Sequence, residues 1–184
     1  MIDVVMYGLM IFIVICIILI WYINTYNKFQ EYLIRINEVE SNIDSILRKR
    51  FDLLNKSIGI IKVINEEMKE KEVLESIVKL RSRKLSNFEL DRQLYEAINE
   101  FHLYKETIPE LKNSESFMKI DLGINESEVE ITALRKYYND IITEYNKITK
   151  TFPSIIVAKI CKYDNKTYFD GKDMTDDITN DFKL

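Results

Sequence analysis

The fold is decided by residues 26–66, YNKFQEYLIRINEVESNIDSILRKRFDLLNKSIGIIKVINE. Apolar residues recur there at alternating spacings of three and four, which is the heptad pattern of a helix that packs along one face. With Tyr26 at heptad position a, the polar exceptions in this seam are Glu40, Arg50 and Ser57. Because Gly and Pro, which would segment a β-protein, are almost missing here, the spacing predicts one long helix.

A second seam of the same kind follows later in the chain, and Ser127 is its one polar position. Tyr137 and Ile142 lie beside it and widen the apolar stripe beyond that of a two-stranded coiled coil. The seam consists of Phe117, Ile120, Ile124, Ser127, Ile131, Leu134, Tyr138, Ile141, Tyr145, Ile148 and Phe152. This pattern predicts a second long helix that needs several partner helices.

Shorter apolar spacings separate the two seams. Those of 73–80 and 90–108 predict one or two helices with a break near Asn87, and Pro109 is expected to end the last of them. Short connections favour antiparallel neighbours. The predicted fold class is therefore all-α, with an N-terminal transmembrane helix that continues into an antiparallel up-and-down four-helix bundle.

The N-terminal apolar run is VVMYGLMIFIVICIILIWYI, residues 4–23, and it contains no charged residue. At about 1.5 Å per residue, such a helix spans the roughly 30 Å hydrocarbon core of a bilayer. A cleaved signal peptide is disfavoured, because no positive n-region or small-residue cleavage site is present. The predicted span is represented by Val4, Ile11, Ile20, Trp21, Tyr22 and Ile23, with the two aromatic residues at the membrane interface.

The charges that flank this run predict its orientation. Asp3 precedes it, whereas Lys28 and Arg35 follow it, and cytoplasmic flanks are enriched in Lys and Arg. We therefore expect a very short N-terminus outside and the remaining chain in the cytoplasm, on a single-pass anchor in the cytoplasmic membrane. No disulfide between Cys16 and Cys161 is expected in that arrangement.

Composition and motifs argue against several kinds of chemistry. With 26 Lys plus Arg against 30 Asp plus Glu, the chain has no basic footprint for nucleic acid. Its one histidine, His102, lacks the Glu three residues earlier that a ferritin-like di-metal site requires, since Asn99 stands there. Glycine-rich phosphate-binding motifs are missing from the sequence as well. We expect no cofactor, no metal and no enzymatic activity.

The polar residues inside the first seam are the candidate specifiers of packing. A lone charge at such a position is costly unless it is paired. We therefore expect Arg50 to be held by a carboxylate of a neighbouring helix, and the candidates are Asp44, Asp52 and Asp140. Glu40 is a further buried polar specifier, and a ligand-binding role for these residues is the alternative.

The chain resembles the LemA family of bacterial membrane proteins. The resemblance rests on SNID (41–44) with RKRFDL (48–53), on EKE (70–72) and on IPELK (108–112). The longest matching block is ALRKYYND (133–140), which continues through Tyr145-Asn146 to TFPS (151–154). The chain departs from the family at Glu40, where an aromatic residue is frequent, and at Asn55, where proline is frequent. The resemblance implies a helical bundle on a single-span anchor and no catalytic residues.

These observations predict three segments: a transmembrane anchor (1–23), a LemA-like helical bundle (24–160) and an acidic tail (161–184) that is mobile or, alternatively, docks on a partner. The expected role is a non-catalytic interaction or scaffold module at the bacterial cytoplasmic membrane. Its partners would be the lipid bilayer and an unidentified protein. The alternative is a sensor or regulatory subunit that passes a signal through the first helix to an enzyme. Homo-oligomerisation is permitted by the sequence but is not indicated by it, because the span lacks a Gly-x-x-x-Gly motif.

Overall fold

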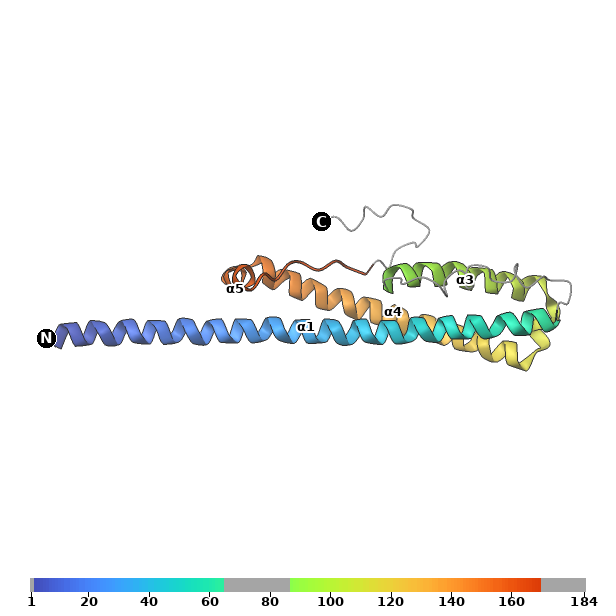
Figure 1. Cartoon of the computed structure of the whole chain (residues 1–184), viewed down its shortest axis with the longest axis horizontal. Coiled ribbons are helices and arrows are strands. Elements are labelled where there is room, and N and C mark those ends of the chain that lie inside the picture. Colours follow the sequence, from blue (N-terminus) through green and yellow to red (C-terminus); the bar gives the residue numbers. More distant parts are fainter. Residues whose placement is uncertain (1, 65–86, 170–184) are drawn as a thin grey trace. The chain divides into compact units, whose positions relative to one another are not determined.

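The computed structural model describes residues 2–64 and 87–169, and within these ranges it contains helices and no strand. The expected helix through residues 73–80, and the last two residues of the stretch 26–66, lie outside the described residues. The predicted all-α class is confirmed. The described elements are α1 (Ile2–Ile64), α3 (Asn87–Thr107), the 3-10 helix η1 (Pro109–Asn113), α4 (Glu115–Lys150) and α5 (Ser154–Cys161) (Figure 1).

Helix α1 is uninterrupted over 63 residues, as the seam predicts. The apolar seam residues of its second half are the most buried side chains of the helix. Those with an exposed fraction of 1% or less are Phe29, Ile36, Ile43, Leu47, Leu54 and Ile61. Because residues three and four apart share one helix face, burying them commits that whole face to neighbouring elements.

Helix α3 begins at Asn87 and ends at Thr107, just before Ile108-Pro109, as the sequence predicts. Ile108 is extended, with φ of -116° and ψ of 94°, because a residue that precedes proline avoids the helical region. Pro109 then opens η1, where a missing N–H costs nothing. Leu111 of η1 is fully buried and anchors this connection.

Helix α4 confirms most of the second seam but corrects its C-terminal end and the width of its apolar stripe. Ile142 is fully buried, as expected, whereas Tyr137 is 49% exposed and does not widen the packed stripe. Phe152 is 82% exposed because α4 already ends at Lys150, and a turn then leads into α5. The Ser154 hydroxyl donates to the Ile148 carbonyl at 2.7 Å and so stabilises that turn.

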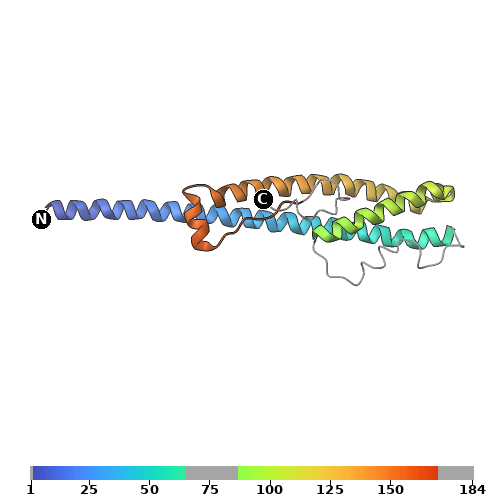
Figure 2. The same cartoon turned by 90° about the horizontal axis from the view of Figure 1, so that it is seen from above.

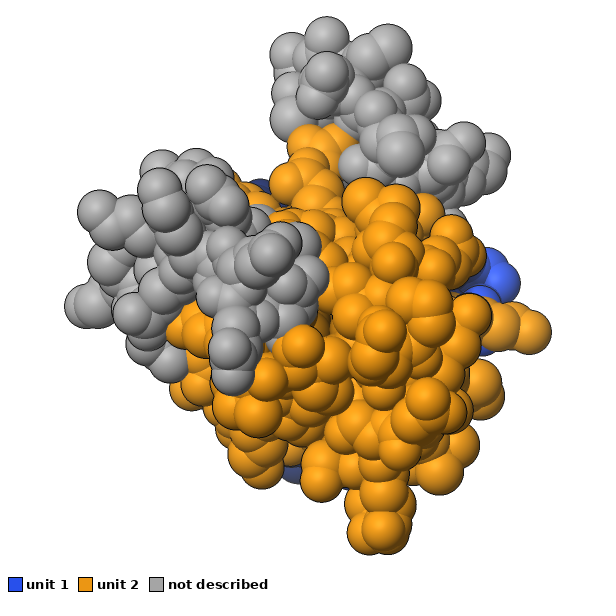
Figure 3. Space-filling view, turned by 90° about the vertical axis from the view of Figure 1, so that its right-hand side faces the viewer, with its two compact units in different colours: residues 1–38, 140–167 blue, residues 39–139, 168–184 orange. Residues whose placement is uncertain are grey.

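The chain divides into two compact units, which Figure 3 colours separately. Unit 1 contains residues 1–38 and 140–167, and unit 2 contains residues 39–139 and 168–184. In unit 1, Phe29 of α1 packs on Tyr145 of α4 and on Tyr163, with ring centroids 6.0 and 4.8 Å apart. These aromatic contacts are part of the core of unit 1, which also contains the buried Ile142 and Val157.

In unit 2, residues of α1, α3 and α4 share a core. Tyr138 bonds to Glu40, whereas Arg50 bonds to Ser127, so residue numbers on α4 fall as those on α1 rise. The two helix segments are therefore antiparallel in this unit, and both views show them side by side (Figures 1 and 2). Phe101 of α3 stacks on Phe117 of α4 at 4.8 Å.

The apolar start of α1 has no packing partner among residues 2–64 and 87–169. Its large apolar residues from Val4 to Ile20 are 45 to 74% exposed, and Ile23 is 54% exposed. Trp21 and Tyr22, which close the run, are half-buried. Among the described residues, α1 is the one helix long and apolar enough to cross a membrane, with a mean hydropathy of 3.0 over its most apolar 18 residues.

The residues that follow α5 are held by specific contacts up to Phe169. Asn146 and Asn139 of α4 bond through their side-chain amides to the backbones of Lys166 and Phe169, respectively, each through one donated and one accepted bond of 2.7 to 2.8 Å. Phe169 is 3% exposed. Residues 163–169 therefore pack against α4 although the segment 161–184 is acidic, because two asparagine side chains form hydrogen bonds with their backbone. Residues 170–184 lie outside the described residues.

Candidate functional site

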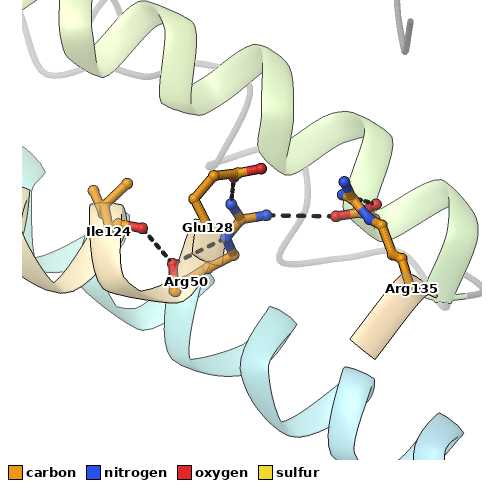
Figure 4. A network of polar contacts seen from close by, with 6 residues as sticks. Arg50, Ile124, Glu128 and Arg135 are labelled. Atoms are coloured by element: carbon orange, nitrogen blue, oxygen red, sulfur yellow. Dashed lines mark hydrogen bonds and ion pairs between the residues drawn. The ribbon is translucent and has the colours of Figure 1, made fainter. Parts of the chain in front are cut away.

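A charged cluster is buried where α1, α3 and α4 meet in unit 2. Arg50 comes from α1, Asp91 from α3, and Ser127, Glu128 and Arg135 from α4 (Figure 4). The side chain of Arg50 is 1% exposed and that of Asp91 is fully buried. We call these five residues the ion network.

The guanidinium of Arg50 has a partner on each of its three nitrogens. Nε donates to Ser127 Oγ at 3.0 Å, Nη1 lies 3.5 Å from Asp91 Oδ1, and Nη2 contacts Glu128 Oε2. The Ser127 hydroxyl donates in turn to the carbonyl of Ile124 at 2.6 Å. The five N–H donors of an arginine can satisfy partners in several directions, which a lysine cannot do from one point charge.

The carboxylate of Asp91 is shared between two arginines. Its Oδ1 faces Arg50, and its Oδ2 accepts from Nη2 of Arg135. The guanidinium of Arg135 also lies over the Phe169 ring, 5.7 Å from its centroid, which is cation-π geometry. With two arginines and two carboxylates, the formal charge of the network is zero, so burial leaves no net charge without a counter-charge.

Burial sets the pKa values within this network. It lowers the pKa of Arg50 to about 10, a shift that Asp91 opposes and Arg135 reinforces. Burial also raises the pKa of the Asp91 carboxyl, and the charges of Arg135 and Arg50 oppose that rise. Arg50 is therefore protonated at neutral pH, and the network acts as a charge-paired connection between three helices.

A small pocket of about 190 Å³ lies in the same unit. Its walls are aromatic and apolar apart from one carboxylate and one amide, and they consist of Glu40, Ile43, Asn87, Phe88, Tyr138 and Phe169. Tyr138 donates to Glu40 Oε1 at 3.3 Å, and the Asn87 amide donates to the Glu40 carbonyl at 3.3 Å. Burial raises the pKa of Tyr138, and the charge of Glu40 and this hydrogen bond raise it further, so the phenol stays protonated and donates.

A second polar cluster joins α3 to α4 near η1. Asp121 is 5% exposed and its Oδ2 accepts from Lys105 Nζ at 2.7 Å. His102 Nδ1 lies 3.9 Å from the other carboxylate oxygen, Oδ1, which has no hydrogen-bond partner among the described residues. Like the ion network, this cluster links charged side chains of two different helices.

The structure corrects the partners expected for Arg50. Asp44 bonds instead to Arg48 one turn along α1 at 2.7 Å, and Asp52 and Asp140 are exposed. The partners are Asp91 and Glu128, because the Arg50 face of α1 points toward α3 and α4 in unit 2. Two other polar residues lie in the first seam. The Ser57 hydroxyl donates a hydrogen bond to the Leu54 carbonyl at 2.7 Å, and Glu40 is half-buried in the pocket wall.

A sequence signal for Asp91 does exist. Asp91 lies three residues before Leu94, which is followed at helical spacing by the buried Ile98 and Phe101. The apolar stripe of α3 therefore continues onto Asp91, and a carboxylate on that stripe calls for a buried cation. Glu128 directly follows the seam residue Ser127, but its side chain is 46% exposed, so no burial pattern distinguishes it.

In its described ranges the chain is helical, with an exposed apolar N-terminal run and an ion network between three helices, and it belongs to the class of helical proteins with a candidate membrane span. The chain is a member of the LemA family, whose model matches residues 39–182. The match covers most of the chain, including both arginines of the network. No curated protein and no solved structure matches the chain.

Proposed function

We propose that this LemA-family protein is a non-catalytic interaction module, anchored by residues 4–23 at the cytoplasmic face of the bacterial cytoplasmic membrane. The observation that carries the proposal is the exposure of the apolar run. No residue of its most apolar 18-residue window is buried, whereas a core helix of equal hydropathy would be covered by protein. A bilayer is the environment in which such a surface is stable.

The flanking charges support a cytoplasmic body. Asp3 lies on the N-terminal side of the run, and Lys28, Arg35 and the cluster Arg48-Lys49-Arg50 lie on the other. In unit 2, α4 runs antiparallel to α1, as an up-and-down arrangement requires. We propose that the body is such an antiparallel four-helix bundle.

An interaction role is supported by an exposed apolar stripe on α4 in unit 2. Met118, Leu122 and Val129 are 39, 59 and 75% exposed, and at 100° per residue they lie within about 40° of one another around the helix. The buried charged groups of the same unit, by contrast, are engaged with each other. The stripe is therefore a surface on which substitutions can test partner binding without disturbing the ion network.

The anchor is tested by topology mapping of the full-length protein in intact cells with the outer envelope removed. An epitope tag on the N-terminus should be digested by added protease, and one on the C-terminus should be protected. The protein should also stay with membranes after alkaline carbonate extraction. Release by carbonate would refute the anchor, and digestion of the C-terminal tag alone would reverse the orientation.

The interaction role is tested by crosslinking in native membranes followed by mass spectrometry. Leu122→Lys and Val129→Lys should abolish a reproducible heterologous crosslink. Leu103→Lys on α3 is the matched control, because its side chain is 58% exposed and it receives the same charge. Recovery of the protein alone, as monomer or homo-oligomer, would refute the interaction role.

A regulatory role is the second candidate, and the continuity of α1 favours it. One helix carries both the apolar run and Arg50 of the ion network. A sensor would alter the accessibility of this network when its stimulus changes, whereas a scaffold would hold its partner in all conditions. Hydrogen exchange of residues 47–54 in membranes, compared between growth conditions, separates the two roles.

A further inference from the structure

Helix α5 presents an apolar face that the described part of the chain leaves uncovered. Ile156 and Ile160 are 44 and 63% exposed, and Phe152 just before the helix is 82% exposed. Ile156 and Ile160 are four positions apart within α5, so they lie on one side of the helix, and Phe152 lies in the turn that precedes it. The opposite side, with Val157 and Ala158, is buried against unit 1. This short helix is thus apolar on both its inner and its outer face.

The position of α5 in unit 1 is level with the end of the apolar run of α1. The Tyr22 hydroxyl lies 3.6 Å from Cys161 Sγ at the last residue of α5, and Tyr163 packs on Phe29. In Figures 1 and 2, α5 lies across the direction of α1. A helix that crosses a membrane-spanning helix at its interfacial end lies in the plane of the membrane surface.

The charged residues within α5 and the segments directly flanking it are lysines, and exposed Glu144 and Asp164 lie just beyond them on either side. Between Tyr145 and Tyr163 the sequence contains four lysines and no Asp or Glu, although the whole chain has a net charge of -4. All four are exposed, and they are Lys147, Lys150, Lys159 and Lys162. Basic residues beside an exposed apolar helix face are the composition of a helix that binds an anionic lipid surface.

Lys162 adds an observation from the backbone. It follows α5 with φ of 56° and ψ of 45°, the left-handed conformation that glycine adopts at lower cost. The Tyr163 N–H then donates to the Ala158 carbonyl at 2.9 Å and closes the helix end. A lysine at a position that favours glycine is consistent with a use for its charge.

We propose that Phe152 and α5 form a second membrane contact, an interfacial helix in the headgroup layer of the cytoplasmic leaflet. Phe152, Ile156 and Ile160 insert beside the acyl chains, and Lys159 and Lys162 pair with the phosphates of anionic lipids. The inference rests on the proposed anchor, because only a span ending near Tyr22 brings α5 to the surface. Two attachment points, unlike one, also fix the rotation of α1 about its axis.

The test places single nitroxide labels on the full-length protein in lipid nanodiscs. In a background with Cys16→Ala and Cys161→Ser, one label replaces Ile156, one replaces Ile11 in the span, and one replaces Glu126, an exposed residue of α4 in unit 2. Frequent collision of a label with oxygen indicates that the label lies in lipid, and frequent collision with a water-soluble nickel chelate indicates that it lies in water. In nanodiscs containing phosphatidylglycerol, the labels at 11 and 156 should favour oxygen, and the label at 126 should favour nickel.

The three labels separate the failure of each proposal. A label at 11 in lipid with a label at 156 in water would overturn the interfacial helix and leave the anchor intact. A label at 11 in water would overturn the anchor and the interfacial helix together. Circular dichroism of each labelled protein confirms that the helices are retained, and labels at the exposed positions 156 and 126 should not disturb packing.

Charge reversal tests the lipid specificity. Lys159→Glu with Lys162→Glu should lower the equilibrium constant for contact of α5 with anionic nanodiscs by about fivefold for each lysine charge lost, and so reduce the lipid exposure of the label at 156. The matched control is Lys112→Glu with Lys136→Glu, two exposed lysines of unit 2, which should leave that label unchanged. Equal effects of the two pairs would refute a specific role for the lysines of α5.

Discussion

Replacing Asp91 with Asn is the sharpest perturbation of the ion network, because it removes one charge and keeps the shape of the side chain. Asp91 is fully buried and faces both Arg50 and Arg135, so the substitution leaves two guanidiniums without the carboxylate they share. Removing one partner of a buried ion pair typically costs about 3 to 5 kcal/mol. Glu128 stays bound to Arg50, and Arg135 is 13% exposed and can reach water, so we expect the lower end, about 3 kcal/mol.

The structure also predicts how much stability each variant of the ion network should lose relative to the others. Arg50→Met leaves Asp91 bound to Arg135, so its cost should be smaller, about 1 to 2 kcal/mol. Glu128→Gln should cost at most about 1 kcal/mol, because the Glu128 side chain is 46% exposed and water screens its charge. Asp52→Asn, an exposed aspartate of α1, is the matched control and should stay within about 0.5 kcal/mol.

The assay is urea unfolding of the full-length protein in mild detergent, followed by far-ultraviolet circular dichroism. The urea concentration at the unfolding midpoint should fall most for Asp91→Asn, less for Arg50→Met and least for Glu128→Gln. The slope of unfolding free energy with urea should stay constant, which indicates a change in stability rather than in compactness. Because Arg50 and Asp91 contact each other, the double variant with Arg50→Met and Asp91→Asn should cost less than the sum of the single variants. An Asp91→Asn effect no larger than that of Asp52→Asn, or unchanged stability and helicity in Arg50→Met, would refute the reasoning.

Three further outcomes follow from the described side chains. The pKa of Tyr138 is raised in the folded protein, so the stability that this phenol contributes is complete below pH about 10 and is lost as the pH rises further. Tyr138→Phe should therefore reduce the loss of stability at alkaline pH. An unchanged pH profile of unfolding would contradict this. Gly59 lies inside α1 with no atom within 4 Å of an added Cβ, so Gly59→Ala should stabilise the protein by about 1 kcal/mol, measured as a higher urea midpoint. Asn139→Ala removes both hydrogen bonds to the Phe169 backbone and should cost about 2 kcal/mol, with faster hydrogen exchange of the Phe169 amide than in Lys136→Ala.

The helices themselves could be predicted because their signal is local. Alternating spacings of three and four locate the packed faces of α1 and α4, and Pro109 locates the end of α3. The predictions were wrong at the end of α4 and at the edge of its packed stripe. Phe152 continues the heptad spacing but lies beyond Lys150, and Tyr137 lies just beside the packed stripe. Spacing describes a regular helix and carries no information about where the chain leaves it.

The residues of the ion network also divide into those that the sequence predicts and those that it does not. A heptad assignment places Arg50 in a packed seam and therefore requires a counter-charge, and the resemblance to the LemA family needs no coordinates. Which carboxylate supplies that charge depends on the rotation and register of three helices, and nearness in sequence to Asp44 or Asp52 says nothing of this. The asparagine contacts that hold residues 163–169 depend on the same geometry, because composition counts charges and does not show which backbone groups find partners. The sequence by itself thus determined the helices, their apolar faces and the need for a buried pair, and only the tertiary structure decided the partners, because pairing is set by distances between side chains that are far apart along the chain.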